Sequence, residues 1–167
     1  MIAEGLVHEG LAVTRMIHDR YHSSLRNPYN EVECSNHYAR AMASHGSFIS
    51  ACGFRYHGPR GEIEFMPRVF AKDAGRAFRA PFITAEGWGT YSQELRGSDS
   101  VYTIRVTHGA LRLTKVTVPI LAKGPHGVAA QINLAGRAEL LDREFVVWDR
   151  EKTEGLGSFG FVMRGPL

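Results

Sequence analysis

The chain has 167 residues, 44% of them hydrophobic and 22% charged, a composition that is typical of a folded globular protein and not of a disordered one. Its net charge is +3, and its basic residues are scattered among acidic ones without forming a basic run, so nucleic acid is not an expected partner. No stretch reaches the roughly 18 apolar residues of a transmembrane helix. No signal peptide is visible either, and the chain is therefore expected to be cytoplasmic.

The two cysteines, Cys34 and Cys52, are too few for a disulfide framework. They flank one predicted helix, and a rise of ~1.5 Å per residue would hold them roughly 27 Å apart. That separation excludes a bond between them. Two reduced thiols are expected.

The first predicted element is a helix from Ile2 to Tyr21, in which Leu6, Val13 and Ile17 recur at near-helical spacing. It begins almost at Met1 without a capping residue. This abrupt start indicates that a further segment normally precedes it, so the N-terminus is expected to be incomplete.

A second helix is predicted from Asn36 to Ala51, with Ser35 or Asn36 as its N-cap. It follows a turn-rich segment in which Pro28 prevents a continuous helix. From Ala41 to Phe54 there is no charged residue, and the large apolar side chains do not form a single stripe. Such a helix is expected to pack against neighbours on several sides.

From Gly53 onward the pattern changes to the alternation typical of strands. Phe54 and Tyr56 are followed by a turn at His57–Gly61 and by a second alternating run. Further strands are predicted at Val101–Thr107, before a turn at His108–Gly109, and then at Leu111–Ile120, Val128–Leu134, Glu144–Trp148 and Phe159–Met163. Helices precede strands without alternation between them, which predicts an α+β fold.

The densest polar cluster, Asn27–Arg40, joins the two predicted helices and leaves three interpretations open. Glu31 and Glu33 could be the acid and base of a glycosidase. They are two residues apart, and on an extended segment this spacing puts their Cα atoms about 6.6 Å from each other. Two neighbours on one segment seldom flank a bond from opposite sides, however. The other interpretations are a helix cap with a salt bridge to Arg40, and sugar binding by Glu31 together with Arg40.

Two other features are weaker candidates. His18 and His22 have a metal-compatible spacing, but no third ligand is indicated, so neither a metal nor another cofactor is expected. Trp88, between Gly87 and Gly89, suits either a stacking platform for a pyranose or a core position where backbones pass closely. Of these two, we expect the core position.

Several blocks of sequence between residues 27 and 93 resemble the C-terminal part of glycoside hydrolase family 116, which comprises non-lysosomal glucosylceramidases and bacterial β-glucosidases and β-xylosidases. The blocks are Asn27–Cys34, His37–Ser44, Cys52–Phe54, Tyr56–Pro59, Phe65–Arg68 and Phe82–Gln93.

The resemblance implies three parts: residues 1–52 as the last helices of an (α/α)6 catalytic barrel, 53–95 as a β-hairpin extension, and 96–167 as an antiparallel, sandwich-like β module. It also implies that Glu31 and Arg40 bind hydroxyls of the glucose. Asn30, His37 and Trp88 are further candidates for substrate binding. The family's catalytic carboxylates lie upstream of the matching region.

The sequence therefore predicts the C-terminal portion of a glycoside hydrolase acting on β-glucosides, which lacks the catalytic pair and is not expected to hydrolyse glycosides by itself. Its expected partners are a β-glucoside and the remainder of the barrel, or a second copy of itself. The alternative is a non-catalytic carbohydrate-binding or interaction module built on the β-rich half.

Overall fold

The computed structural model divides the chain into two compact units, Met1–Gly53 and Phe54–Leu167, which we describe separately. The first contains helices and the second strands, so the fold is α+β and dominantly β. The structure describes residues 1–28, 30–31, 35–36, 41–70, 75–96, 99–119, 121, 129–141, 144–150 and 158–164. Side chains are described for residues 1–28, 42–70, 75–96, 100–119 and 121.

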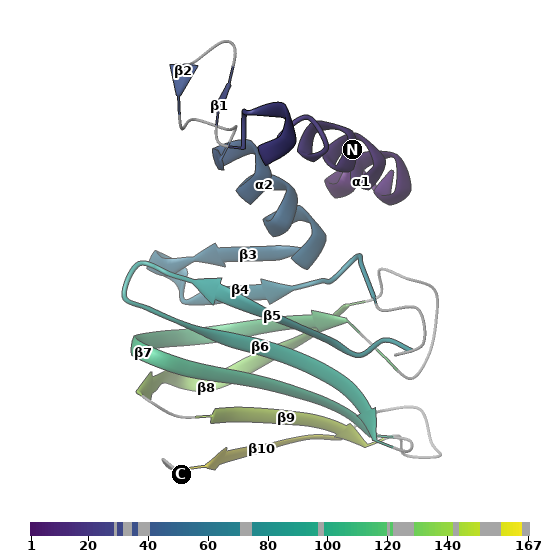
Figure 1. Ribbon diagram of the computed structural model, residues 1–167. Coiled ribbons are helices and arrows are strands. Elements are labelled where there is room, and N and C mark those ends of the chain that lie inside the picture. Colours follow the sequence, from purple (N-terminus) through teal and green to yellow (C-terminus); the bar gives the residue numbers. More distant parts are fainter. Residues whose placement is uncertain are drawn as a thin grey trace. The chain divides into compact units, whose positions relative to one another are not determined.

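The unit Met1–Gly53 contains two α-helices and a short two-stranded sheet (Figure 1). The elements are η1 (Ile2–Glu4), α1 (Val7–His18), η2 (Ser23–Leu25), β1 (Asn30–Glu31), β2 (Ser35–Asn36) and α2 (Ala41–Cys52). No helix in the described part of the chain combines the length and apolar character required to cross a membrane.

The first helix is shorter than predicted because Gly5 interrupts it. Gly5 has a left-handed backbone conformation (φ 88°), which closes the 3₁₀ turn of η1 before α1 begins. Ile2 then packs against Gly10, where a Cβ atom would lie 2.5 Å from the Ile2 Cγ1 atom. The predicted single helix from Ile2 to Tyr21 is thus wrong at both ends, since α1 ends at His18.

The second helix also begins later than predicted. Ser35 and Asn36 form strand β2, so neither is the N-cap, and α2 begins at Ala41. In its interior the hydroxyl of Ser50 donates to the carbonyl of Gly46 at 2.9 Å, which satisfies the polar side chain within the helix. The helix ends at Cys52, and the next residue, Gly53, has a positive φ of 56° that terminates it before β3 (Phe54–His57).

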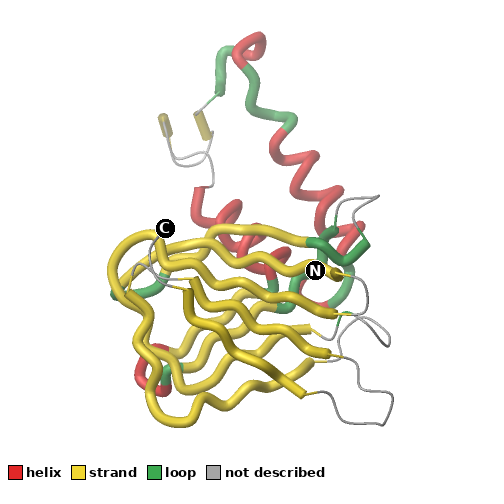
Figure 2. Tube along the Cα trace, turned by 90° about the horizontal axis from the view of Figure 1, so that it is seen from below, coloured by secondary structure: helices red, strands yellow, loops and turns green. Residues whose placement is uncertain are grey.

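Eight strands of the described part join into the sheet of the unit Phe54–Leu167 (Figures 1 and 2). They are β3 (Phe54–His57), β4 (Glu62–Phe65), β5 (Phe78–Ile83), β6 (Gly87–Arg96), β7 (Asp99–Pro119), β8 (Ala129–Leu141), β9 (Glu144–Arg150) and β10 (Ser158–Arg164). The pairings are antiparallel except that β4 runs parallel to β7.

The long strand β7 belongs to two halves of this sheet. Its first half pairs with β6 on one side and β9 on the other, which continues to β5 and β10. Its second half pairs with β8 and β4, and β4 pairs in turn with β3. The predicted segments Val101–Thr107 and Leu111–Ile120 therefore belong to one strand as far as its end at Pro119, and Ile120 lies outside the described residues.

Aromatic contacts pack the two halves against each other. The ring of Phe65 on β4 stacks on that of Tyr91 on β6, with centroids 4.0 Å apart, and meets Phe82 on β5 edge-on at 5.6 Å. Since the hydrogen-bonded neighbours of β4 are β3 and β7, these contacts join the halves through side chains rather than backbone. Each such buried aromatic contributes roughly 1.5–3 kcal/mol to folding.

The prediction of a turn at His108–Gly109 is wrong, because strand β7 continues through these two residues without interruption. Gly109 adopts a positive φ of 77°, and a Cβ atom there would lie 2.1 Å from the carbonyl oxygen of Glu86. The pairing register between β6 and β7 shifts at Trp88 and Gly89. A bulge thus accommodates the left-handed glycine within a continuous strand.

The sequence also suggested a division between residues 95 and 96. In the structure, β6 ends at Arg96 and pairs along its length with β7, which begins at Asp99. The strands on the two sides of that position are hydrogen-bonded neighbours within one compact unit.

Candidate functional site

The cluster expected to bind sugar is described only in its backbone. Asn30 and Glu31 form β1, which pairs with β2 in antiparallel register, Asn30 opposite Asn36 and Glu31 opposite Ser35. His37, Arg40 and Glu33 lie outside the described residues, as do the side chains of Asn30 and Glu31. The predicted contact between Glu31 and Arg40 therefore stays a prediction.

Asn27, the first residue of this cluster, has a structural role. Its side-chain amide donates to the carbonyl of Arg20 at 2.7 Å, and its side-chain oxygen accepts from the backbone N–H of His22 at 3.3 Å. The two bonds close the chain that leaves α1 into a compact loop. Asn27 thereby stabilises the loop that follows α1.

Trp88 does not occupy the core position that we expected. Its side chain is 49% exposed, whereas Tyr91 on the same strand is fully buried. Its ring stacks on that of His108, with centroids 4.3 Å apart and an interplanar angle of 22°. The backbones of β6 and β7 do pass closely here, but the large side chain lies on the outer face, so the predicted core position is wrong.

Three glycines allow this arrangement by bringing β6 and β7 together. A Cβ atom at Gly89 would lie 1.8 Å from the carbonyl oxygen of Arg105, and one at Gly87 would lie 2.6 Å from that of His108. Gly109 is equally restricted by the carbonyl of Glu86. Because only glycine fits at each position, the backbone under Trp88 is held in one geometry.

Trp88 is the centre of a row of side chains across three strands. Ile83 on β5 pairs with Trp88 on β6, which pairs with His108 on β7. We call Ile83, Trp88 and His108 the Trp88 row. All three side chains are exposed, Ile83 to 66%.

Polar residues adjoin the Trp88 row in register and in sequence. The next row of the same face contains Pro81, Thr90 and Arg105 in register. At the turn between β5 and β6, Glu86 forms an ion pair with Arg112 at 2.7 Å. An aromatic face beside hydroxyl, carboxylate and guanidinium groups is suited to a ligand with one apolar face and a hydroxyl periphery.

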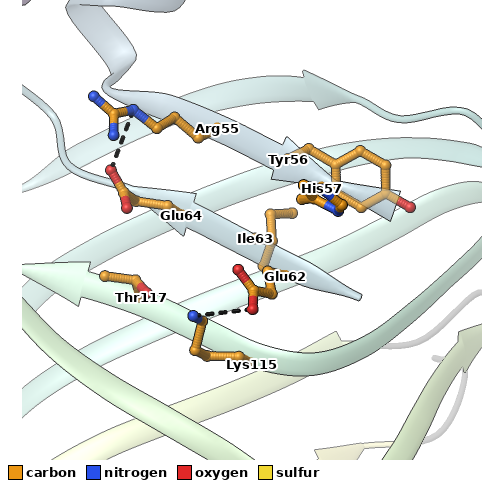
Figure 3. A pocket seen from close by; sticks show the side chains of 8 residues that line it. All are labelled: Arg55, Tyr56, His57, Glu62, Ile63, Glu64, Lys115 and Thr117. Carbon is orange, nitrogen blue, oxygen red and sulfur yellow. Dashed lines mark ion pairs between the residues drawn. The ribbon is translucent and has the colours of Figure 1, made fainter. Parts of the chain in front are cut away.

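A second candidate is a shallow depression of about 360 Å³ over β3, β4 and β7 (Figure 3). Its polar lining comes from basic residues on β3 and β7 and acidic residues on β4 between them. The polar residues are Arg55, His57, Glu62, Glu64, Lys115 and Thr117. Lys115 pairs with Glu62 at 3.1 Å, and Arg55 with Glu64 at 3.7 Å. The charges thus neutralise one another across neighbouring strands, which is typical of a stabilised sheet surface.

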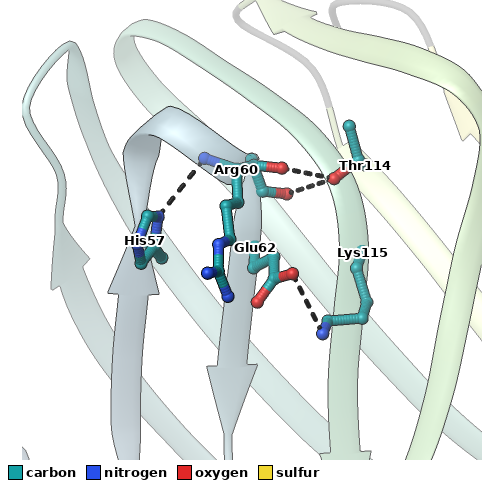
Figure 4. A network of polar contacts seen from close by, with 6 residues as sticks. His57, Arg60, Glu62, Thr114 and Lys115 are labelled. Atoms are coloured by element: carbon teal, nitrogen blue, oxygen red, sulfur yellow. Dashed lines mark hydrogen bonds and ion pairs between the residues drawn. The ribbon is translucent and has the colours of Figure 1, made fainter.

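The rim of this depression is fixed by the turn between β3 and β4 (Figure 4). The backbone N–H of Arg60 donates to Nδ1 of His57 at 3.3 Å, and the hydroxyl of Thr114 donates to the carbonyl of Arg60 at 2.5 Å. The carbonyl of Gly61 accepts from the backbone N–H groups of Thr114 at 2.7 Å and Lys115 at 3.2 Å. His57 and Thr114 therefore anchor the turn.

The described residues offer little for nucleophilic or metal chemistry. Burial raises the pKa of the free Cys52 thiol to about 11, which leaves it protonated near neutral pH. Nδ1 of His22 accepts from the backbone N–H of Ser24, so this ring stabilises the loop after α1. Within the described residues, no group of three or more His, Cys, Asp or Glu side chains could hold a metal ion.

Sequence reasoning did not identify His108, which it assigned to a turn. The available signal was the pair of glycines around Trp88, which requires a close neighbouring strand and hence a residue opposite Trp88. No protein family model matches the chain, and no curated protein matches it at a significant level.

Proposed function

We propose that this chain is the C-terminal portion of a glycoside hydrolase acting on β-glucosides, and that it contributes glucose-binding residues rather than the catalytic carboxylates. The observation that carries the proposal is the uncovered apolar surface of the helical unit. This surface agrees with the resemblance to the last helices of an (α/α)6 barrel, whose other helices would cover it.

Large apolar side chains are exposed on both helices. On α2, which has no charged residue, Met42 is 74% and Phe48 41% exposed. On α1, Met16 is 70% exposed, and Leu11, Val13 and Ile17 are exposed as well. Isolated exposed apolar residues are ordinary, but two adjacent helices that expose this many indicate a surface made for packing.

In this proposal the glucose-binding residues come from the segment that joins the two helices and contribute to the sugar pocket of the barrel. Glu31 accepts hydrogen bonds from sugar hydroxyls, and Arg40 donates to them, with Asn30 and His37 nearby in the sequence. Charge-assisted hydrogen bonds of this kind are about twice as strong as neutral ones. The chemical step belongs to carboxylates outside these residues.

The test is isothermal titration with methyl β-D-glucopyranoside, carried out in a Trp88→Ala background so that only the barrel residues are probed. The proposal expects millimolar binding that Glu31→Ala and Arg40→Ala each weaken about tenfold or more, the loss of a hydrogen bond to a charged group. Glu9→Ala, which removes an exposed carboxylate from α1, is the matched control and should bind unchanged. Unchanged binding in Glu31→Ala and Arg40→Ala would refute the assignment.

A second candidate function is a non-catalytic carbohydrate-binding module on the β-rich unit. The exposed stack of Trp88 and His108 favours it. The two functions are separable, because Glu31 and Arg40 belong to the unit Met1–Gly53 and Trp88 to the unit Phe54–Leu167.

A further inference from the structure

We infer that the free face of Trp88, backed by His108, is a stacking site for the apolar face of a glucose unit in a β-linked oligosaccharide. This site is distinct from Glu31 and Arg40. Its existence as a stacking site rests on the geometry of the Trp88 row, whereas the choice of a β-linked glucose ligand rests on the proposed function.

One face of Trp88 is open to solvent. Most of the surface of an indole lies on its two faces, and His108 covers one of them at a centroid distance of 4.3 Å. Because 49% of the side chain nonetheless remains exposed, the opposite face is accessible. The stacked imidazole also restricts rotation of the indole, so the open face has a defined orientation.

The backbone beneath this face is rigid for an independent reason. Gly89 and Gly109 allow the strands to approach so closely that a Cβ atom at either position would meet a carbonyl oxygen at 1.8 Å and 2.1 Å, respectively. The turn before Trp88 is closed by Thr84, whose backbone N–H and hydroxyl both donate to the carbonyl of Gly87 at 2.8 Å. A site held in this way loses little conformational entropy when it binds a ligand.

The surroundings of the Trp88 row favour a sugar over a protein partner. A stable protein interface buries about 800 Å² on each side around an apolar centre. In the Trp88 row and the row that adjoins it, the exposed apolar residues are Ile83, Trp88 and Pro81, and Thr90 and Arg105 stand beside Pro81 in the adjoining row. Glu86, at the turn that precedes Trp88, and Arg112 on β7 form an ion pair that adds charged hydrogen-bonding groups.

The ring geometry of glucose fits this surface. In β-linked glucose the hydroxyl groups are equatorial, so each face of the ring presents axial C–H groups. Their slight positive charge is attracted to the negative π face of an indole, while the equatorial hydroxyls point outward to polar neighbours. An oligosaccharide places several such units in line, so its affinity should exceed that of a single glucose.

The experiment is an NMR titration of the ¹⁵N-labelled full chain with cellotetraose. The chain carries the double substitution Glu31→Ala/Arg40→Ala, which removes the other predicted sugar contacts. The two tryptophans, Trp88 and Trp148, give two indole N–H signals, and the Trp88→Phe spectrum assigns them. We expect a saturable shift of the Trp88 signal. Isothermal titration should give about tenfold weaker binding for Trp88→Ala, with Trp88→Phe close to the parent because it keeps an aromatic face.

Leu95→Ala is the matched control, since Leu95 is an exposed apolar residue on the same strand, and it should bind like the parent. Absence of a Trp88 shift, or equal affinity of the parent and Trp88→Ala, would overturn the inference. If the Trp88 signal shifted with protein concentration in the absence of sugar, the inference would be overturned, because the indole face would then contact a second copy of the chain. Binding of cellotetraose in this background is independent of Glu31 and Arg40, so failure here and failure of the glycosidase proposal are distinguishable.

Discussion

The rings of Trp88 and His108 lie face to face across the paired strands β6 and β7, with centroids 4.3 Å apart, on the solvent side of the sheet. Stacked rings on two paired strands form a cross-strand contact that stabilises the pairing. The pair therefore contributes to stability at the bulge as well as providing a binding surface.

A double-mutant cycle measures this link. Trp88→Ala and His108→Ala should each destabilise the chain by about 1 kcal/mol, and their effects should be coupled by about 0.5–1.5 kcal/mol. The measurement is urea unfolding followed by circular dichroism. His108→Ala combined with Leu95→Ala should be additive within about 0.5 kcal/mol. Additivity of the Trp88 and His108 substitutions would show that the stack does not persist in solution.

Glycine substitutions test the close approach of β6 and β7. Gly89→Ala places a Cβ atom 1.8 Å from the backbone oxygen of Arg105, so the strands must separate, and we expect a loss of at least about 3 kcal/mol in unfolding free energy. Gly75→Ala is the matched control, because its φ of 58° is left-handed but its surroundings are open. It should cost only about 1–2 kcal/mol. Similar losses in both variants would contradict the close approach of β6 and β7 at Gly89.

The buried Tyr91 predicts a loss of stability at alkaline pH. Burial, and to a lesser extent Tyr102, raises the pKa of the Tyr91 phenol well above 10 in the folded chain. Both states are neutral at this group below about pH 10. Above it the unfolded chain loses the proton and the folded chain keeps it, so stability falls as pH rises, by up to about 1.4 kcal/mol per pH unit.

The measurement is the urea midpoint between pH 8 and pH 11. Tyr91→Phe should abolish this part of the alkaline decline, at a cost at neutral pH because the hydroxyl of Tyr91 donates to Oε1 of Gln93 at 2.7 Å. Leaving that buried oxygen unpaired costs about 1–3 kcal/mol. Tyr56→Phe removes a half-buried hydroxyl from β3 and is the control. A decline that is equally steep in Tyr91→Phe would assign it to other groups.

The two helical glycines predict opposite outcomes for the same substitution. Gly46→Ala in α2 meets open space and should stabilise the helix by about 0.5–1 kcal/mol. Gly10→Ala in α1 would place its Cβ atom 2.5 Å from Ile2 Cγ1 and should instead displace Ile2 and destabilise the unit. Thermal unfolding monitored at the helical circular-dichroism band separates the two. A Gly46→Ala variant that melts earlier than the parent would indicate that this face of α2 is already covered.

Local patterns in the sequence predicted several elements correctly. The alternation of Phe54, Tyr56, Ile63 and Phe65 around a glycine-containing turn predicted a hairpin, and β3 and β4 confirm it with Phe54 opposite Phe65. This prediction succeeds because the side-chain period of a strand and the requirements of a turn are properties of neighbouring residues. The role of Glu31 and Arg40 stays a prediction, since it depends on resemblance and on side chains outside the described residues.

Local patterns were enough to predict the order of helices and strands and the hairpin of β3 and β4. The continuation of β7 through Gly109 and the exposure of Trp88 emerge only when the strands are packed together. Both depend on which strand lies beside which: Gly109 lies within a continuous strand against the carbonyl of Glu86, and Trp88 lies on the face of β6 opposite the buried residues Gly87, Gly89 and Tyr91. Pairing between residues distant in the chain is set by the balance of packing over the whole sheet, which local periodicity does not record.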